Sequence, residues 1–124
     1  MYEICVWRKF NASHYLKYSA GRKDDSHSHI WKIEVYIRSN EINSDGILID
    51  FNYVDKLLTS IVAKLKNKHL NNIKQFKETN PSAENISRFI YEDMKSLLPA
   101  TIELARVVVW ETPHYCAIYF DGSK

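Results

Sequence analysis

Histidines are the residues of this 124-residue chain best suited to chemistry, since three of the five lie between positions 14 and 29. His27-Ser28-His29 runs directly into an alternating apolar segment that starts at Trp31. In an extended chain, residues two apart share a face, with Cα atoms about 6.5–7 Å apart. Two imidazoles so placed can reach one cation, and His14 can supply a third from the preceding segment. Three neutral nitrogens with an open fourth position are typical of catalytic zinc, and imidazoles favour zinc over calcium or magnesium.

The histidines and the cysteines each have a simpler interpretation. For His27 and His29 it is a pair of exposed histidines in a polar loop, and the presence of His14 is what favours the metal site. Cys5 and Cys116 lie near opposite ends of the chain. A disulfide between them is one interpretation, and two buried thiols in a reducing cytosol are the simpler one.

Composition bounds the class of protein. Hydrophobic residues make up 45% and charged residues 26%, which indicates one globular domain over residues 1–124. A net charge of +2 is too small to favour nucleic acid or an anionic membrane as a partner. The N-terminal segment lacks the apolar core of a signal peptide, and no uncharged run is long enough to span a bilayer. We therefore expect a cytoplasmic protein.

The elements that must position the histidines follow from hydrophobic patterning. Asp50 and Ser82 are expected N-caps of two amphipathic helices, the first ending near 66–68 and the second stopped by Pro99. Four segments read as strands: residues 2–10, 31–38, 101–110 and 115–120. The order β-β-α-α-β-β predicts an α+β fold, a four-stranded antiparallel sheet with both helices on one face.

The opposite face of this sheet is also partly apolar. Tyr36 lies opposite the apolar face of its strand, and Val107, Val108 and Val109 are apolar on both sides of theirs. Helices can cover only one face, so subunits are expected to pack on the other or to join at sheet edges. We therefore expect a homo-oligomer.

Six segments, in order and with compatible spacing, resemble one family across almost the whole chain. The family is that of 6-pyruvoyltetrahydropterin synthase, which includes the 6-carboxytetrahydropterin synthase of queuosine biosynthesis. Its tunnelling fold (T-fold) has the element order predicted above. The six segments are Phe10-Asn-Ala-Ser-His14, His27-Ser-His29, Gly46-Ile-Leu-Ile-Asp-Phe51, Leu70-Asn71, Asn80-Pro-Ser-Ala-Glu-Asn85 and Val109-Trp-Glu-Thr-Pro113.

The resemblance implies a site and an assembly. His14, His27 and His29 match the family's zinc ligands, with Ser28 in place of the usual glycine. Glu111-Thr112 matches the motif whose glutamate holds the pterin ring, where a carboxylate can accept two ring-edge protons in a fork. Family members form trimers or dimers of trimers, as homohexamers, with sites between subunits.

The family's proton-transfer residues are missing. Lys23 stands where a catalytic cysteine is usual, and Lys66 and Asn67 stand in place of an Asp-His pair. Such residues act as a unit, so their joint loss favours a changed reaction over a damaged enzyme.

Two replacements are open for the base. Asp24 lies three residues before His27, near a position where some family members carry a glutamate, and the alternative is a solvated loop carboxylate. His69 lies two positions beyond the family's histidine, and the alternative is a surface residue. Lys23 is a third option, as a phosphate contact or as a base.

The resemblance therefore predicts a zinc-dependent lyase acting on 7,8-dihydroneopterin triphosphate or a related pterin. The alternative is a non-catalytic pterin- or purine-binding homologue that keeps Zn²⁺ and the ring anchor but has lost the proton-transfer residues.

Overall fold

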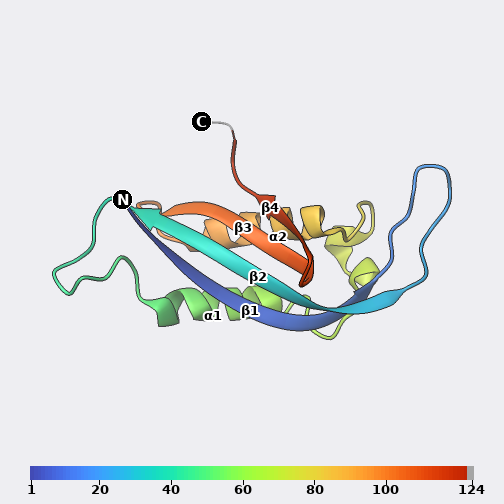
Figure 1. The fold of residues 1–124 in the computed structure, drawn as a ribbon, viewed down its shortest axis with the longest axis horizontal. Coiled ribbons are helices and arrows are strands. Elements are labelled where there is room, and N and C mark those ends of the chain that lie inside the picture. The colour runs from blue at the N-terminus through green and yellow to red at the C-terminus, as the bar shows by residue number, and fades with distance from the viewer. Residues whose placement is uncertain (123–124) are drawn as a thin grey trace.

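A computed structural model describes residues 1–122, and their fold is one four-stranded antiparallel sheet with two helices on one face (Figure 1). The strands lie in the order β1-β2-β3-β4, each antiparallel to the next. Short 3-10 turns, η1 (Leu70–Asn72) and η2 (Lys74–Phe76), connect the helices. The predicted α+β fold and its β-β-α-α-β-β order are confirmed. The main elements are β1 (Tyr2–His14), β2 (His27–Ser39), α1 (Phe51–Val62), α2 (Ala83–Leu97), β3 (Glu103–Thr112) and β4 (Tyr115–Tyr119).

The core lies between the sheet and the helices. Each helix turns a buried stripe toward the sheet, and the predicted caps are confirmed: Asp50 accepts from the Asn52 amide and Ser82 from the Asn85 amide. Within residues 1–122, no helix is long and apolar enough to cross a membrane. The alternating apolar residues of β2 are fully buried, and so are residues of both helices; this set includes Trp31, Ile33, Val35, Ile37, Val54, Leu58, Ile86, Ile90 and Met94.

The first two strands are longer than predicted, and this difference places the site. β1 runs on to His14 and β2 begins at His27, where sequence patterning indicated a loop. The two strands pair along their whole length, with His14 opposite His27 at the last step of the ladder. Backbone pairing thus holds polar residues in extended conformation although their side chains carry no strand pattern.

The first helix is shorter than predicted, and the chain that follows it turns back toward β1. It ends at Val62, and Asn67 takes a left-handed conformation with φ 60°. The Asn67 amide then donates to the carbonyl of Asn11, and the Ser13 amide donates to the carbonyl of Lys68. Residues 67–69 therefore cover the outer edge of β1 near its end.

The open face of the sheet is a mixed surface of aromatic and charged side chains. Trp110 donates from Nε1 to Glu34 at 3.0 Å, and Trp7 and Ile118 are about half exposed. Cys5 and Cys116 point to this face and are free and exposed, so the prediction of buried thiols is wrong. Its cause is the strand alternation, which turns both away from the helices.

Candidate metal centre

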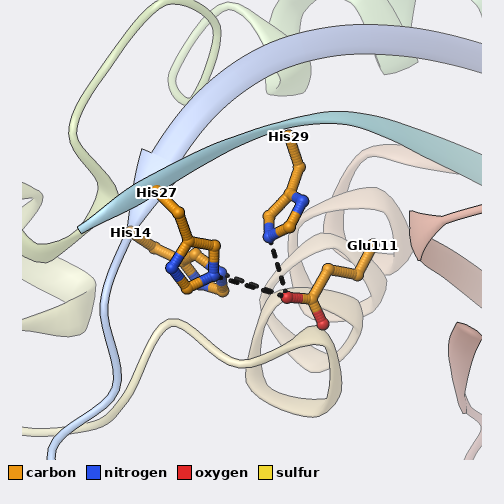
Figure 2. A group of neighbouring side chains, drawn as sticks. All are labelled: His14, His27, His29 and Glu111. Carbon is orange, nitrogen blue, oxygen red and sulfur yellow. Dashed lines mark ion pairs between the residues drawn. The ribbon is translucent and has the colours of Figure 1, made fainter. Parts of the chain in front are cut away.

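Four side chains from three strands converge where the long hairpin extends beyond β3. His14 ends β1, His27 and His29 begin β2, and Glu111 lies near the end of β3. All four project to the helix-covered side of the sheet, because each shares strand parity with a core residue. Their donor atoms lie within 4.8 Å of one another, and Figure 2 shows them turned toward a common point.

The carboxylate of Glu111 lies against all three imidazoles. Its Oε1 is 3.2 Å from Nε2 of His14, 3.1 Å from Nε2 of His29 and 3.9 Å from Nε2 of His27. His14 is only 1% exposed and forms the base of the cluster, while His27 and Glu111 lie at its rim. The ring of Trp31 meets the rings of His14 and His29 edge-on and fixes their orientation.

Backbone carbonyls set the tautomers of two of these histidines. Nδ1 of His14 lies 2.7 Å from the carbonyl oxygen of Pro81, and Nδ1 of His27 lies 2.9 Å from that of Asp25. A carbonyl oxygen can only accept, so both Nδ1 atoms carry the proton. In the neutral ring, Nε2 is then a bare electron-pair donor, which is the usual outer-shell arrangement of a metal-binding histidine.

These donors fit a cation. Among residues 1–122, the buried side-chain nitrogens without a hydrogen-bond partner are Nε2 of His14 and Nε2 of His29. Burial lowers the pKa of His29, as do the charges of His27 and His14, while Glu111 opposes the shift, so the neutral donor form is favoured. Lone pairs facing a carboxylate repel it unless positive charge lies between them. Three imidazoles and one carboxylate suit zinc in chemistry and number.

Two asparagines hold the chain that follows His14. The Asn71 side chain both accepts from the Tyr15 amide and donates to the Tyr15 carbonyl, each at 2.9 Å. Asn80 does the same with Lys17, each at 2.8 Å. We call these paired contacts the Asn71 and Asn80 clamps. The Asn80 clamp ties the hairpin to the segment that carries Pro81, so the Asn80-Pro81 motif positions His14, a candidate metal ligand, through its backbone.

Sequence reasoning missed this role, although a signal was present. The motif from Asn80 to Asn85 was interpreted as the start of a helix capped by Ser82 and as one segment of the family resemblance, and neither interpretation assigns a contact to the Pro81 carbonyl. The structure gives its polar residues distinct contacts: Asn85 donates from Nδ2 to the Asn80 carbonyl, while Ser82 caps α2.

The two candidate bases lie outside the four-residue cluster. The Asp24 carboxylate accepts from the hydroxyl of Tyr18 at 3.1 Å, in the half-buried part of the hairpin loop. Nδ1 of His69 lies 3.0 Å from Oγ of Ser13, and its ring stacks on Tyr15 with centroids 5.6 Å apart. Lys23 is exposed, with its ammonium 5.6 Å from the Tyr15 ring centroid.

A hollow of about 640 Å³ adjoins the cluster at the free edge of β2 beyond β3. Glu111 and Thr112 line it, as the resemblance requires of a ring-binding pair. Lys9 and Lys32 line it too, and they stand directly opposite each other in the β1–β2 ladder. The complete lining is Lys9, Ser28, His29, Ile30, Lys32, Trp110, Glu111, Thr112 and Pro113.

Comparison with known proteins decides the family. Residues 3–121 match the family model described as 6-pyruvoyl tetrahydropterin synthase. The chain belongs to the 6-pyruvoyl tetrahydropterin synthase family. This membership confirms the resemblance seen in the sequence, and the sheet and helices are those of the family's T-fold.

Individual relatives place the chain within the 6-pyruvoyl tetrahydropterin synthase family. It is 31% identical over 102 residues, 82% of each chain, to the dihydroneopterin monophosphate aldolase of Pyrococcus furiosus. The solved structure of Caenorhabditis elegans 6-pyruvoyl tetrahydropterin synthase superimposes with a TM-score of 0.82, at 21% identity and 98% coverage of both chains. The Plasmodium vivax enzyme follows at 0.80, 18% identity and 97% coverage of both. A further structure of that enzyme carries an alanine in place of a glutamate described as catalytic.

Proposed function

We propose that this protein is a zinc-dependent lyase that cleaves the side chain of a phosphorylated 7,8-dihydropterin. The observation that carries the proposal is the convergence of His14, His27 and His29 beside Glu111 at the mouth of a hollow. Similarity to an aldolase of dihydroneopterin monophosphate favours carbon–carbon cleavage as the reaction. The absence of the family's cysteine, with Lys23 in its place, agrees with a reaction other than that of a 6-carboxytetrahydropterin synthase.

The protein's residues divide into holding and proton-moving groups. His14, His27 and His29 would hold the zinc ion, which supplies a Lewis acid that lowers the pKa of substrate hydroxyls. Glu111 would accept the ring N–H and amino protons in a fork, beside the Thr112 hydroxyl. In an aldol-type cleavage, a base removes a proton from the hydroxyl on the second side-chain carbon. The bond to the first side-chain carbon breaks, its electron pair enters the conjugated ring system, and that carbon takes up a proton.

Asp24 and His69 remain the proposed candidates for the base. A glutamate described as catalytic in the Plasmodium vivax relative supports a carboxylate in this role, which favours Asp24. Asp24 is held by the Tyr18 hydroxyl on the hairpin that carries His27 and His29. His69 lies at the covered edge of β1, and its Ser13 contact orients the ring.

The basic side chains of the hollow support a phosphorylated substrate. Lys9 and Lys32 face each other across two strands, and like charges so placed repel unless an anion lies near them. Glu34 offsets part of this charge, at 3.6 Å from the Lys32 ammonium. A phosphate on the end of the pterin side chain would complete the neutralisation.

We further propose a trimer or a dimer of trimers with sites shared between subunits. β1 and β4 are the outer strands of the sheet within residues 1–122, and the open face carries half-exposed Trp7 and Ile118. Unpaired edges and apolar patches of this kind favour association. Light scattering coupled to gel filtration should give about three or six times 14.6 kDa. A monomeric mass at micromolar concentration would contradict the assembly.

The activity test uses the zinc-loaded protein with dihydroneopterin, its monophosphate and its triphosphate. The expected result is release of a hydroxymethyl-dihydropterin and a two-carbon aldehyde phosphate from the monophosphate, detected by chromatography with fluorescence and by mass spectrometry. Tight binding of all three without any product would select the non-catalytic pterin-binding protein instead. If the protein neither binds nor turns over any of the three compounds, the pterin function is excluded.

A further inference from the structure

The position of the Glu111 carboxylate assigns it a contact that ring binding does not need. Donors bound about 2.0–2.1 Å from a tetrahedral zinc ion are roughly 3.3–3.4 Å from one another. Oε1 of Glu111 lies 3.2 Å from Nε2 of His14 and 3.1 Å from Nε2 of His29, close to this donor–donor spacing. Oε1 therefore stands where a fourth donor of the same centre would stand.

The unpartnered imidazole nitrogens support the same assignment. Neither Nε2 of His14 nor Nε2 of His29 has a hydrogen-bond partner, although Oε1 of Glu111 is within reach of both. Ligands of one ion have this relation, because they lie close together and direct their lone pairs at the shared centre.

Ring binding makes a competing demand on this carboxylate. A fork to a pterin edge uses both oxygens, one for the ring N–H and one for the amino group. Oε1 is the oxygen that lies against all three histidines. Three imidazoles and Oε1 would fill the four positions of a tetrahedral zinc ion, so a substrate hydroxyl can become the fourth donor only if the carboxylate leaves.

We propose that Glu111 is the fourth metal ligand of the ligand-free protein and leaves the metal when a pterin binds. The side chain is 29% exposed and lines the hollow, so it has room to turn from the histidines to a ring. The open metal position that catalysis requires then exists only while a heterocycle occupies the site. The exchange rests on the proposed pterin function, whereas the ligand role does not.

The ligand role is tested without substrate, by competition between the protein and a chelator for zinc. Glu111→Gln and Glu111→Ala should weaken zinc affinity at least about 10-fold, since an anionic donor is removed from the centre. The matched control is Glu103→Gln, at the other end of β3, which should leave the affinity unchanged. Circular dichroism and thermal melting establish that each variant is folded. Zinc affinity within 2-fold of the wild type in both Glu111 variants would overturn the proposal.

The exchange is tested with cobalt in place of zinc and 6-methylpterin as the probe, which has the ring but no side-chain hydroxyl to bind the metal. 6-Methylpterin at a concentration shown by fluorescence to saturate the site should change the visible spectrum of the cobalt-loaded wild type. Saturation of Glu111→Ala, established by its own fluorescence titration, should leave its spectrum unchanged, since no carboxylate is there to move. An unchanged wild-type spectrum at saturation would overturn the exchange. Absence of 6-methylpterin binding to the wild type would instead count against the pterin function, while the zinc competition still decides the ligand role.

Discussion

Nδ1 of His14 donates to the carbonyl oxygen of Pro81 across 2.7 Å, joining residues 67 positions apart in the chain. The bond leaves Nε2 free to bind a cation and ties the most buried histidine of the cluster to the segment that starts α2. The candidate metal centre is therefore anchored on both sides of the sheet–helix boundary.

The first prediction concerns the ligand set. Replacement of His14 or His29 by alanine removes one of three imidazole donors and should weaken zinc affinity by more than about 100-fold, beyond the cost of losing an outer-shell contact. Chelator competition measures the loss. His114→Ala is the control, because His114 is exposed and does not belong to the cluster of His14, His27, His29 and Glu111. Equal losses in His114→Ala and His14→Ala would contradict the assignment.

The second prediction concerns the Asn71 clamp. Asn71→Ala removes two hydrogen bonds to the Tyr15 backbone and leaves that backbone partly buried, which should reduce the free energy of unfolding by about 1–3 kcal/mol. Urea denaturation of the two proteins gives the difference. Asn72→Ala alters the exposed neighbour and should change stability by less than about 0.5 kcal/mol. If Asn72→Ala reduced the free energy of unfolding as much as Asn71→Ala, the Asn71 clamp would not be the source of the stability difference.

The third prediction concerns the support beneath the ligands. Trp31 is fully buried and contacts the rings of His14 and His29, so Trp31→Ala should cost about 3–5 kcal/mol in unfolding free energy. Trp31→Phe should cost less while still loosening the histidines, which zinc competition would detect as weaker binding. Trp7→Ala serves as the control on the open face, where half of the side chain is exposed. Comparable destabilisation by Trp7→Ala would be against this account.

The fourth prediction concerns the base. If Asp24 removes the hydroxyl proton, Asp24→Asn should lower kcat about 100-fold or more and leave zinc affinity unchanged. Asp25→Asn is the matched control, because Asp25 is an exposed neighbour whose known contact is made by its backbone carbonyl. Retained turnover in Asp24→Asn, with loss in His69→Asn, would transfer the role to His69.

The fifth prediction concerns the phosphate. Lys9→Gln and Lys32→Gln should each raise KM for the monophosphate about 10-fold, because each removes a positive charge beside the expected anion. The KM for unphosphorylated dihydroneopterin is the internal control and should remain within 2-fold. A parallel rise for both compounds would mean that the lysines support the hollow rather than the phosphate.

Much of the architecture was predictable because it rests on hydrophobic periodicity. Trp31, Ile33 and Val35 alternate cleanly, and their strand and its buried face were predicted correctly. Periodicity could not extend β1 to His14, since that extension depends on pairing with a distant polar segment at His27. The same holds for the segment after α1, where the hydrogen bond from Asn67 to Asn11 joins the chain to a residue far away in the sequence.

The site was predictable in its residue types but not in its contacts. The spacing of His27 and His29 on one strand face indicates that the two side chains can share one cation. His14 lies beside them in the structure, as expected. The contact of Glu111 with these histidines depends on where β3 stops relative to β2, a register that no local pattern encodes. The Pro81 carbonyl carries no side-chain signal at all, because every residue has one.

The Asn71 and Asn80 clamps lie between the hairpin tip and the candidate metal centre in the chain, and they fix the backbone at that point. Both clamps act at Tyr15 and Lys17, before the exposed turn that Tyr18 and Arg22 close through their backbones. Exposed tips of this kind accept inserted sequence with little cost to the fold. A fluorophore or affinity peptide introduced between residues 19 and 21 would therefore mark the protein for imaging or immobilisation while the histidine cluster stays in place.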